Sequence, residues 1–446
     1  MPHRRLAPLV LATGLSLACL PLAAQQPQVP DADAAATAAQ DGGSKIPLDE
    51  IRRYVAVYSA VKAAYVEPVD DEQLMHSAIR GLLLDLDPHS AYLEADAADE
   101  FEEQARGNYD GIGVEIFRQP DGSLRVIAPI DDTPAARAGV KAGDLIVAID
   151  GTPLRAGEGD SSTPLRGEPG TTVELTILRD GEEQPLKLDV ERQTINIASV
   201  RGRMLEPGYG YVRVSTFQAD TAADFERKVA SLSGEAGGRL RGLVIDLRSN
   251  PGGLLTSAVQ IADALLDDGA IVSTRGRIPV SDAVFNATPG DRLHGAPVVV
   301  LVDAGSASAS EVLAGALGDN GRARIVGSRT FGKGSVQTVL PLDNGDSVKL
   351  TTARYYTPDG RSIQALGIVP DVVLHADAGS GDGRPAGYTE ADLPGHLGAE
   401  DAGDGEAQPG VNAGEVLDGE RHVAAALAEL KKLVAAAPAT AATPKG

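Results

Sequence analysis

Apolar residues near the start of the chain recur every three or four positions, which is the spacing of an amphipathic helix. The pattern begins at Leu48 and continues through Ile51, Tyr54, Tyr58 and Val61. A second helix is predicted from about residue 71 to residue 86, because the Asp87-Pro88 step disfavours a further helical turn. Together the two patterns predict an N-terminal helical region at residues 47–104.

Residues 105–192 have the pattern of short strands and turns. Val173, Leu175 and Ile177 alternate with polar residues, as in a half-buried strand, and Asp180-Gly181 is a typical hairpin turn. We therefore predict a small β-rich domain in this part of the chain.

The four residues Gly111-Ile112-Gly113-Val114 stand at the entrance to one of these strands. Glycines at such a point let successive N–H groups converge on a carboxylate, and the strand edge behind them can pair with an extended peptide. A peptide-binding loop and a plain glycine turn both explain these residues.

Residues 193–375 contain nearly continuous apolar strands, of which 243–245 and 298–302 are the clearest. Strands of this kind are covered on both faces, and here they alternate with helical stretches near 220–233, 254–267 and 309–318. The region is therefore predicted to be an α/β core.

The remaining segments are recognised by composition. Residues 1–24 place two arginines before an apolar run and small residues, which is typical of a secretory signal. Export to the periplasm is therefore expected, with membrane association if the signal is retained. Residues 25–46 predict a disordered tether, and residues 376–420, with eleven acids and one arginine, predict a solvated acidic linker. A final helix is predicted at residues 421–437.

Charge and cysteine content narrow the classes of function. The 446 residues include 40 Lys and Arg against 63 Asp and Glu, a formal net charge of -23 that would repel phosphate backbones. No nucleic-acid partner is therefore expected. Cys19 is the only cysteine and lies in the predicted signal, and no H-E-x-x-H pattern is present, so no metal site or other cofactor is expected.

A serine-rich segment, Gly305 to Glu311, follows the apolar strand at 298–302. A serine placed where a strand leads into a helix lies among unpaired N–H groups, which can stabilise an oxyanion. Ser308 occupies this position. Ser308 and Glu311 also fit a capping box, which would explain the same residues without catalysis.

A second segment, Phe331 to Gln337, supplies a lysine that the chain can return to Ser308. A helix of about ten residues advances ~15 Å, and a five-residue strand returns ~16 Å. If the segment is extended, Lys333 and Gln337 share one face. A surface lysine on a glycine-rich loop is the alternative. An S-x-x-K motif at Ser59 and Lys62 lacks its usual partner motifs, so we interpret it as a chance match.

A third segment, Asp246 to Gly253, ends another apolar strand with a Pro-Gly-Gly turn. This turn can present the N–H of Gly252 or Gly253 to the same end of the sheet, where the Ala309 N–H would be the second oxyanion donor. An ordinary strand-to-helix loop would have the same sequence.

Together these segments resemble the C-terminal processing peptidases, also called tail-specific proteases. The resemblance covers about residues 48–375 and includes LDPHSAYL (86–93), DLRSNPGGLL, GSASASEVLAG and TFGKGSVQ. It implies a core of the ClpP/crotonase type with an inserted PDZ domain, and protein substrates with unstructured C-terminal tails. It also implies that Ser308 is the nucleophile, Lys333 the base and Gln337 the support of the lysine. A homo-oligomer and an adaptor protein are further partners that the resemblance allows.

One part of the chain departs from the family pattern. Leu154 to Leu165 has two glycines and a proline where the second PDZ helix is expected, and these residues disfavour a helix interior. We therefore expect looser gating by this domain. Arg166, which follows directly, is a candidate for coupling the PDZ domain to the core, and an ordinary surface arginine is the alternative.

The main hypothesis is an exported serine endopeptidase that captures C-terminal tails and cleaves through an acyl-enzyme. A catalytically silent PDZ scaffold on the same core is the alternative from another class. A crotonase-like acyl-CoA enzyme is a third reading, which the predicted signal disfavours because CoA substrates are chiefly cytoplasmic.

Overall fold

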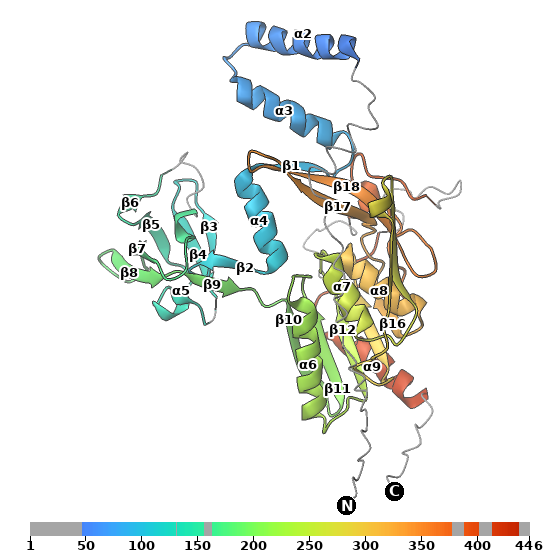
Figure 1. Cartoon of the computed structure of the whole chain (residues 1–446). Coiled ribbons are helices and arrows are strands. Elements are labelled where there is room, and N and C mark those ends of the chain that lie inside the picture. The colour runs from blue at the N-terminus through green and yellow to red at the C-terminus, as the bar shows by residue number, and fades with distance from the viewer. Residues whose placement is uncertain (1–46, 131, 156–162, 377–387, 401–412, 437–446) are drawn as a thin grey trace, which may run out of the picture. The chain divides into compact units, whose positions relative to one another are not determined.

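The computed structural model describes residues 47–130, 132–155, 163–376, 388–400 and 413–436 (Figure 1). The predicted signal and tether lie outside these ranges. The chain divides into two units after Tyr54, and the described part of the first unit, residues 47–54, contains the beginning of helix α2. The second unit contains the rest of the described chain.

The N-terminal region contains three helices: α2 (Leu48–Ala64), α3 (Asp71–Leu84) and α4 (Ala95–Arg106). Helix α3 begins where it does because the Asp70 side chain accepts a hydrogen bond from the Glu72 N–H at 2.8 Å. Helix α4 ends at Gly107, whose φ of +83° suits glycine. The apolar spacing predicts the first two helices. Helix α4 is not among the predicted elements, and its apolar positions, Ala98, Phe101 and Ala105, are mostly alanine.

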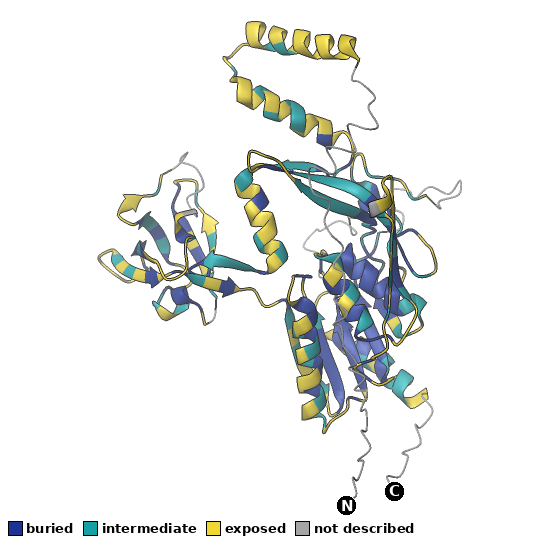
Figure 2. Ribbon diagram, in the orientation of Figure 1, coloured by how far each residue is buried: buried dark blue, intermediate teal, exposed yellow. Residues whose placement is uncertain are grey.

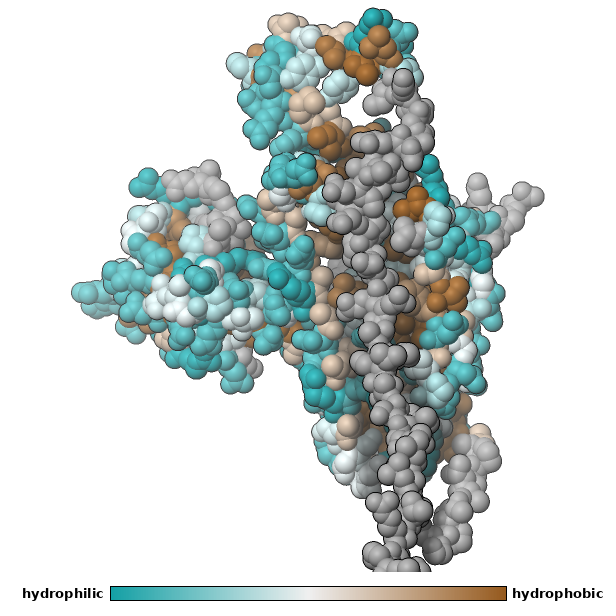
Figure 3. Space-filling view, in the orientation of Figure 1, coloured by the Kyte–Doolittle hydropathy of each residue, from teal (hydrophilic) through white to brown (hydrophobic). Residues whose placement is uncertain are grey.

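Apolar side chains remain exposed on this region, as the brown patches in Figure 3 show. Helix α2 has no buried residue. Its large exposed apolar residues are Leu48, Ile51, Tyr54, Val55 and Val57.

The predicted β-rich domain is a sheet with its own core and the strand order β3-β4-β5-β7-β8. Its members are β3 (Val114–Arg118), β4 (Leu124–Pro129), β5 (Leu145–Ile149), β7 (Thr172–Leu178) and β8 (Leu186–Glu191), with the short β6 (Thr152–Pro153) on β5. The alternating residues Val173, Leu175 and Ile177 are all fully buried, as their spacing predicts. In the segment 154–165, residues 156–162 lie outside the described ranges, and 163–165 form a single 3-10 turn.

The β-rich domain is inserted into the chain between two paired strands. Strand β2 (Asn108–Gly111) enters it and β9 (Gln193–Asn196) leaves it, and the two are antiparallel with Gly111 opposite Gln193. Both ends of the domain therefore meet at one β-ribbon.

The α/β core is built on a six-stranded sheet with the order β10-β11-β12-β15-β16-β19. Its strands are β10 (Val200–Glu206), β11 (Tyr209–Val214), β12 (Gly242–Asp246), β15 (Val298–Val302), β16 (Ala323–Gly327) and β19 (Val372–Val373). All pairs except β10-β11 are parallel.

Helices cover both faces of this sheet, as the apolar strands predict (Figure 2). The helices that share one apolar cluster with the sheet are α6 (Thr221–Glu235), α7 (Leu255–Asp263) and α8 (Ala309–Asp319). Helix α9 (Glu420–Ala436) packs on the other face, where Leu430 and Val423 meet Val244 and Val299.

A second, antiparallel sheet carries part of the site. Its strands are β1 (Ala91–Leu93), β13 (Ala270–Gly276), β14 (Ala283–Asn286), β17 (Ser335–Pro341) and β18 (Ser347–Tyr356). Strand β1 comes from the LDPHSAYL block and pairs with β18, as does β17. Residues far apart in the sequence therefore meet on β18.

Two segments of the predicted acidic linker contain residues that are buried in the protein beside others that stay exposed. Glu390, in the 3-10 turn η3 (Glu390–Asp392), is fully buried, and so is Leu417. Hydrogen bonds hold both segments: the Glu390 N–H donates to the Phe331 carbonyl at 3.0 Å, and the Leu417 N–H donates to Asp303 at 3.1 Å. The average composition of residues 376–420 conceals these specific contacts.

Candidate active site

Ser308 stands at the junction of β15 and α8 in an unusual backbone conformation. Its φ is +53°, a region that non-glycine residues rarely adopt and that tends to occur at functional sites. Its side chain is only 8% exposed. The neighbouring hydroxyls are committed to backbone carbonyls: Ser306 donates to Leu247 at 2.8 Å and Ser310 to Asn250 at 2.9 Å. The middle serine is thus set apart from the other two.

Helix α8 is capped through the backbone of Ser308. The Ser308 N–H donates to Glu311 Oε2 at 2.8 Å, and the Glu311 N–H donates to the Ser308 carbonyl at 2.9 Å, as at a capped helix start. The capping interpretation therefore accounts for Glu311. The phenol of Tyr355 on β18 lies beside the Ser308 hydroxyl: burial raises the pKa of Tyr355, and a side-chain hydrogen bond with Ser308 opposes that shift.

Glu311 joins the Ser308 turn to the lysine segment. Its Oε2 also accepts the Lys333 N–H at 2.9 Å, while Oε1 accepts the Gly332 N–H at 2.7 Å and the Thr330 hydroxyl at 2.5 Å. One carboxylate oxygen therefore holds the backbones of Ser308 and Lys333 together. Glu311 is fully buried, and burial raises its pKa to about 7 although these hydrogen bonds favour the charged form.

Lys333 has an environment that favours a neutral amine. Burial lowers its pKa, and the positive charge of Lys349 lowers it further. Glu390, Glu311 and Asp87 oppose this shift without cancelling it. Within the described part of the chain, no hydrogen bond joins the Lys333 amine to the Ser308 hydroxyl. The two residues are brought together through their backbones.

Gln337 does not contact Lys333 through its amide N–H group. Its Nε2 donates to Ser335 Oγ at 3.0 Å and to Thr351 Oγ1 at 3.2 Å. Strand β17 begins at Ser335, so Lys333 lies before the strand, and the alternation expected to place Lys333 and Gln337 on one face does not extend to the lysine.

Asp87 of the LDPHSAYL block continues this polar network. It accepts the Thr351 hydroxyl at 3.0 Å, the Ser90 hydroxyl at 2.7 Å and the His89 N–H at 2.8 Å. Burial would raise the pKa of Asp87, but these hydrogen bonds hold it below its usual range. The block is thus a structural part of the site that the sequence motif alone does not explain.

The Pro-Gly-Gly turn lies against Ser308. A Cβ atom added to Gly252, whose φ is +106°, would be 2.9 Å from Ser308 Cβ and 3.1 Å from the Ala309 nitrogen. The Gly252 N–H is committed to Asn250 Oδ1 at 2.9 Å. Among the described residues, the N–H groups of Gly253 and Ala309 have no hydrogen-bond partner, so both can donate to a bound group.

The glycine loop of the β-rich domain borders a cavity of about 160 Å³. Gly113 has a φ of +79°, and a side chain there would overlap Thr133. The residues lining the cavity are Tyr109, Ile112, Gly113, Val114, Ile116, Leu165 and Arg166. Gly111, the last residue of β2, lies between Tyr109 and Ile112 in the sequence and is not among the lining residues.

Arg166 connects this cavity to α4. Its guanidinium pairs with Glu103, lies 3.8 Å from Glu100 and stacks over the Tyr109 ring. The carbonyl of Ala105, near the end of α4, accepts the Ala219 N–H of the core at 3.0 Å. A continuous chain of contacts thus leads from Arg166 to the segment beside the Pro-Gly-Gly turn.

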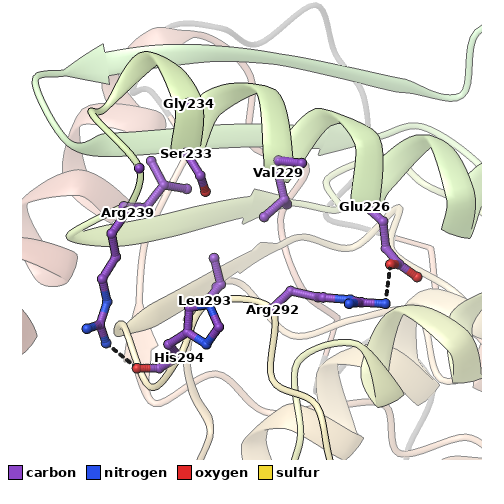
Figure 4. A pocket seen from close by; sticks show the side chains of 11 residues that line it. Glu226, Val229, Ser233, Gly234, Arg239, Arg292, Leu293 and His294 are labelled. Atoms are coloured by element: carbon purple, nitrogen blue, oxygen red, sulfur yellow. Dashed lines mark hydrogen bonds and ion pairs between the residues drawn. The ribbon is translucent and has the colours of Figure 1, made fainter.

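A larger cavity of about 500 Å³ lies between α6 and residues 292–294 (Figure 4). Arg292 pairs with Glu226 there at 2.9 Å, and Arg239 donates to the His294 carbonyl. This cavity contains none of the residues around Ser308.

The S-x-x-K pair on α2 has no such surroundings. Ser59 is exposed, and the Lys62 amine pairs with Asp71 at 2.7 Å. These contacts agree with the interpretation of the motif as a chance match.

Comparison with known proteins places the chain in a family. Residues 208–374 match the model of peptidase family S41, residues 110–190 match the PDZ domain, and residues 9–97 match the N-terminal domain of the activating protease CtpB. The architecture is thus an α/β serine peptidase core with an inserted PDZ domain.

Sequence relatives identify the kind of peptidase. A carboxy-terminal-processing protease of Bartonella bacilliformis is 41% identical over 354 residues, which cover 78% of this chain and 80% of the relative. The carboxy-terminal processing protease CtpA of Bacillus subtilis is 33% identical over 336 residues, with 75% and 70% covered. The chain belongs to the carboxy-terminal processing protease family of serine peptidases.

Among solved structures, the photosystem II D1 C-terminal processing protease is 35% identical, with 72% of this chain and 92% of that chain covered and a TM-score of 0.41.

In the described ranges of the present chain, the helices are too short or too polar to cross a bilayer.

Proposed function

We propose that this protein is an exported endopeptidase that cleaves substrates with unstructured C-terminal tails through a Ser308/Lys333 dyad. The observation that carries the proposal is the sharing of Glu311 Oε2 by the N–H groups of Ser308 and Lys333. This contact connects a serine in a strained turn with a lysine whose pKa is lowered by burial.

The dyad reacts through an acyl-enzyme. Lys333, as the free amine, accepts the proton of the Ser308 hydroxyl while Oγ bonds to the scissile carbonyl carbon. The N–H groups of Gly253 and Ala309 hold the oxyanion, with Gly252 shaping the turn. Collapse of this intermediate breaks the C–N bond, and the Lys333 ammonium protonates the leaving amine. A water molecule, deprotonated by Lys333, then releases the acyl group.

The side chains of the dyad must move closer for this step. Catalytic hydrogen bonds are often long in the free enzyme and tighten only when substrate binds. The Glu311 contacts restrict that movement to the side chains, because the backbones on both sides are already tied. In this proposal Gln337 supports Lys333 through the strand that follows it, where its amide holds Ser335 and Thr351.

Tail capture belongs to the PDZ domain in this proposal. The N–H groups of the Gly111-Ile112-Gly113-Val114 loop would bind a terminal carboxylate, and the edge of β3 would pair with the tail. Arg166 lines the same cavity and pairs with Glu103 of α4. A peptide bound in the cavity would therefore shift α4 and, through it, the hydrogen bond between Ala105 and Ala219. This route is our basis for a coupling role of Arg166.

The remaining parts of the proposal concern location and partners. The arginines and apolar run of residues 1–24 support export to the periplasm, with membrane association if the segment is retained. The exposed apolar residues of α2 support self-association through this helix, and an adaptor protein is a further candidate for the same surface.

The test uses two matched Ser/Lys pairs in one chain. Ser308→Ala and Lys333→Met should each lower cleavage of a tailed peptide by at least about 10³-fold, with an unchanged unfolding temperature. Ser59→Ala and Lys62→Met, in the exposed pair on α2, should cleave at the wild-type rate.

A serine-directed acylating probe distinguishes the silent scaffold from the enzyme. We expect labelling of Ser308 in the wild type and its loss in Lys333→Met. Wild-type cleavage by Ser308→Ala would refute the nucleophile, and the absence of labelling and cleavage in the wild type would favour a peptide-binding scaffold.

A further inference from the structure

Part of the chain beyond the matched peptidase region packs against the lysine segment. The family match ends at residue 374, whereas residues 388–400, which we call the strap, lie beyond it. The Glu390 N–H donates to the Phe331 carbonyl at 3.0 Å, two residues before Lys333. The Glu390 side chain is fully buried although it is a carboxylate. Burial of this kind requires partners that repay the loss of water.

Gln364 provides the connection from the other side of Lys333. Its Oε1 accepts the Gly334 N–H at 2.9 Å, and its Nε2 donates to Glu390 Oε1 at 2.9 Å and to the Leu397 carbonyl at 3.0 Å. The side chain is 0% exposed. One buried amide therefore links the residue after Lys333 to two points on the strap.

His89 completes the surroundings of Glu390. Its Nε2 lies 2.8 Å from Glu390 Oε2, and its N–H donates to Asp87. The strap thus meets both the LDPHSAYL block and the lysine segment. The far end of the strap is held separately, because Arg354 donates to the Gly398 carbonyl at 2.5 Å and Tyr356 donates to Glu400.

We propose that the strap positions the catalytic lysine, with Gln364 and Glu390 as positioning residues that act through the backbone on either side of Lys333. The inference deepens the proposed function and rests on Lys333 being the base. It makes peptidase activity depend on a segment outside the matched peptidase region. The Glu390 N–H holds the Phe331 carbonyl, and the Gln364 side chain spans from Gly334 to the strap.

The two residues are expected to act in different ways. Loss of the Gln364 amide leaves the Gly334 N–H without its partner, so the lysine segment can move and kcat should fall. Glu390 additionally places a negative charge near Lys333, which favours the ammonium form. The other charged groups that act on Lys333 are Lys349, Glu311 and Asp87.

The first experiment replaces Gln364 by Met, which has a similar volume and no amide. We expect Gln364→Met to lower kcat for a tailed peptide about tenfold, with KM within about twofold of the wild type. Glu400→Gln is the matched control, because Glu400 lies on the strap but contacts Tyr356 and Arg354 instead. The control should keep the wild-type kcat.

The second experiment measures kcat against pH in Glu390→Gln, which keeps the size of the side chain and removes its charge. Removing a negative charge lowers the pKa of the lysine, so more free amine is present at a given pH. The acid limb of the profile should therefore move to lower pH by several tenths of a unit, and Glu400→Gln should not move it. If the strap had only a structural role, Glu390→Gln would lower the unfolding temperature and leave the acid limb of the kcat profile unchanged.

The outcomes separate the strap from the proposed function. Wild-type kcat in Gln364→Met, or an unshifted acid limb in Glu390→Gln, would overturn the positioning role while Lys333→Met remains inactive. Full activity of Lys333→Met would instead overturn the dyad itself. If either Gln364→Met or Glu390→Gln fails to fold, the other variant still tests the proposal. Gln364→Met tests the hydrogen bond that positions the lysine segment, and Glu390→Gln tests the effect of the negative charge on Lys333.

Discussion

The Ser308 site and the PDZ loop are built in opposite ways. Around Ser308, the carboxylate of Glu311 and the amide of Gln364 are fully buried and hydrogen-bonded to backbone groups of the lysine segment. Around Gly113, the cavity is small, and the side chain of Arg166 is 40% exposed. Next to this cavity, residues 163–165 form a single 3-10 turn.

This difference is what the proposed roles of the two sites require. Bond cleavage requires reacting groups that are fixed to within a fraction of an ångström, and buried hydrogen bonds provide that restraint. Capture of a flexible tail requires an accessible strand edge and a few donors. Substitutions at the two sites should therefore change different kinetic constants.

The largest effect on the comparison is expected from replacing one glycine by alanine at each site, in two separate variants. Gly252→Ala introduces a Cβ 2.9 Å from that of Ser308, in a backbone conformation that disfavours alanine, and should lower kcat about 10²-fold. Gly113→Ala introduces a Cβ into Thr133 and should instead raise KM for a tailed peptide about tenfold. Steady-state kinetics with peptides of equal cleavage site, with and without the tail, measure both.

Gly139→Ala is the control for backbone strain alone. Gly139 has a φ of +87° and open space around its Cβ position. Both constants should stay within about twofold of the wild type, with a free energy of unfolding about 1 kcal/mol lower. If Gly252→Ala changed only KM, the contrast between the two sites would be wrong.

An intermediate effect is expected from Glu311→Gln. An amide nitrogen cannot accept the N–H groups that a carboxylate oxygen accepts, so activity should fall about tenfold. The pH dependence of stability should change as well. Burial raises the pKa of folded Glu311 to about 7 from an ordinary value of 4.5, so the folded protein binds more protons between these pH values than the unfolded chain does.

The contribution of Glu311 to the free energy of unfolding therefore falls as pH rises through this window. Urea unfolding at pH 5 and at pH 7.5 measures it, with the wild type losing more stability over the interval than Glu311→Gln by about 1–3 kcal/mol. Equal losses in both proteins would mean that Glu311 stays ionised in the folded state down to its ordinary range.

The smallest effect is expected from Arg166→Ala. The ion pair with Glu103 is partly exposed, so its loss should change the free energy of unfolding by no more than about 1 kcal/mol. Cleavage of a tailed peptide should fall about threefold to tenfold, and cleavage of a peptide too short to reach the PDZ domain should not change. An equal fall for both peptides would indicate a local defect and remove the coupling role.

Much of the architecture follows from local patterns in the sequence. The alternation at Val173, Leu175 and Ile177 predicts a half-buried strand, and the unbroken apolar run at 298–302 predicts a buried one. Both are found, because strand periodicity depends only on which faces are covered. The approach of the Ser308 and Lys333 segments also follows from element lengths.

Other parts of the site have no local signature. Glu311 fits a capping box from the sequence, but its bonds to Gly332 and Lys333 involve backbone donors about twenty residues away, and no pattern of side chains marks them. The burial of Glu390 has no local signature for a similar reason, since the composition of an acidic, glycine-rich stretch does not show which of its carboxylates find buried partners. The hydrogen bonds of Gln337 to Ser335 and Thr351 are likewise not marked by periodicity.

The paired strands β2 and β9 join the PDZ domain to the rest of the chain at a single ribbon, so the domain proposed to choose the substrate can be separated from the core proposed to cleave it. Because the PDZ domain begins and ends on neighbouring residues, Gly111 and Gln193, it can be removed or exchanged by closing the ribbon with a short hairpin turn. A chain organised in this way can acquire a new recognition domain in a single recombination event, while the residues around Ser308 remain untouched.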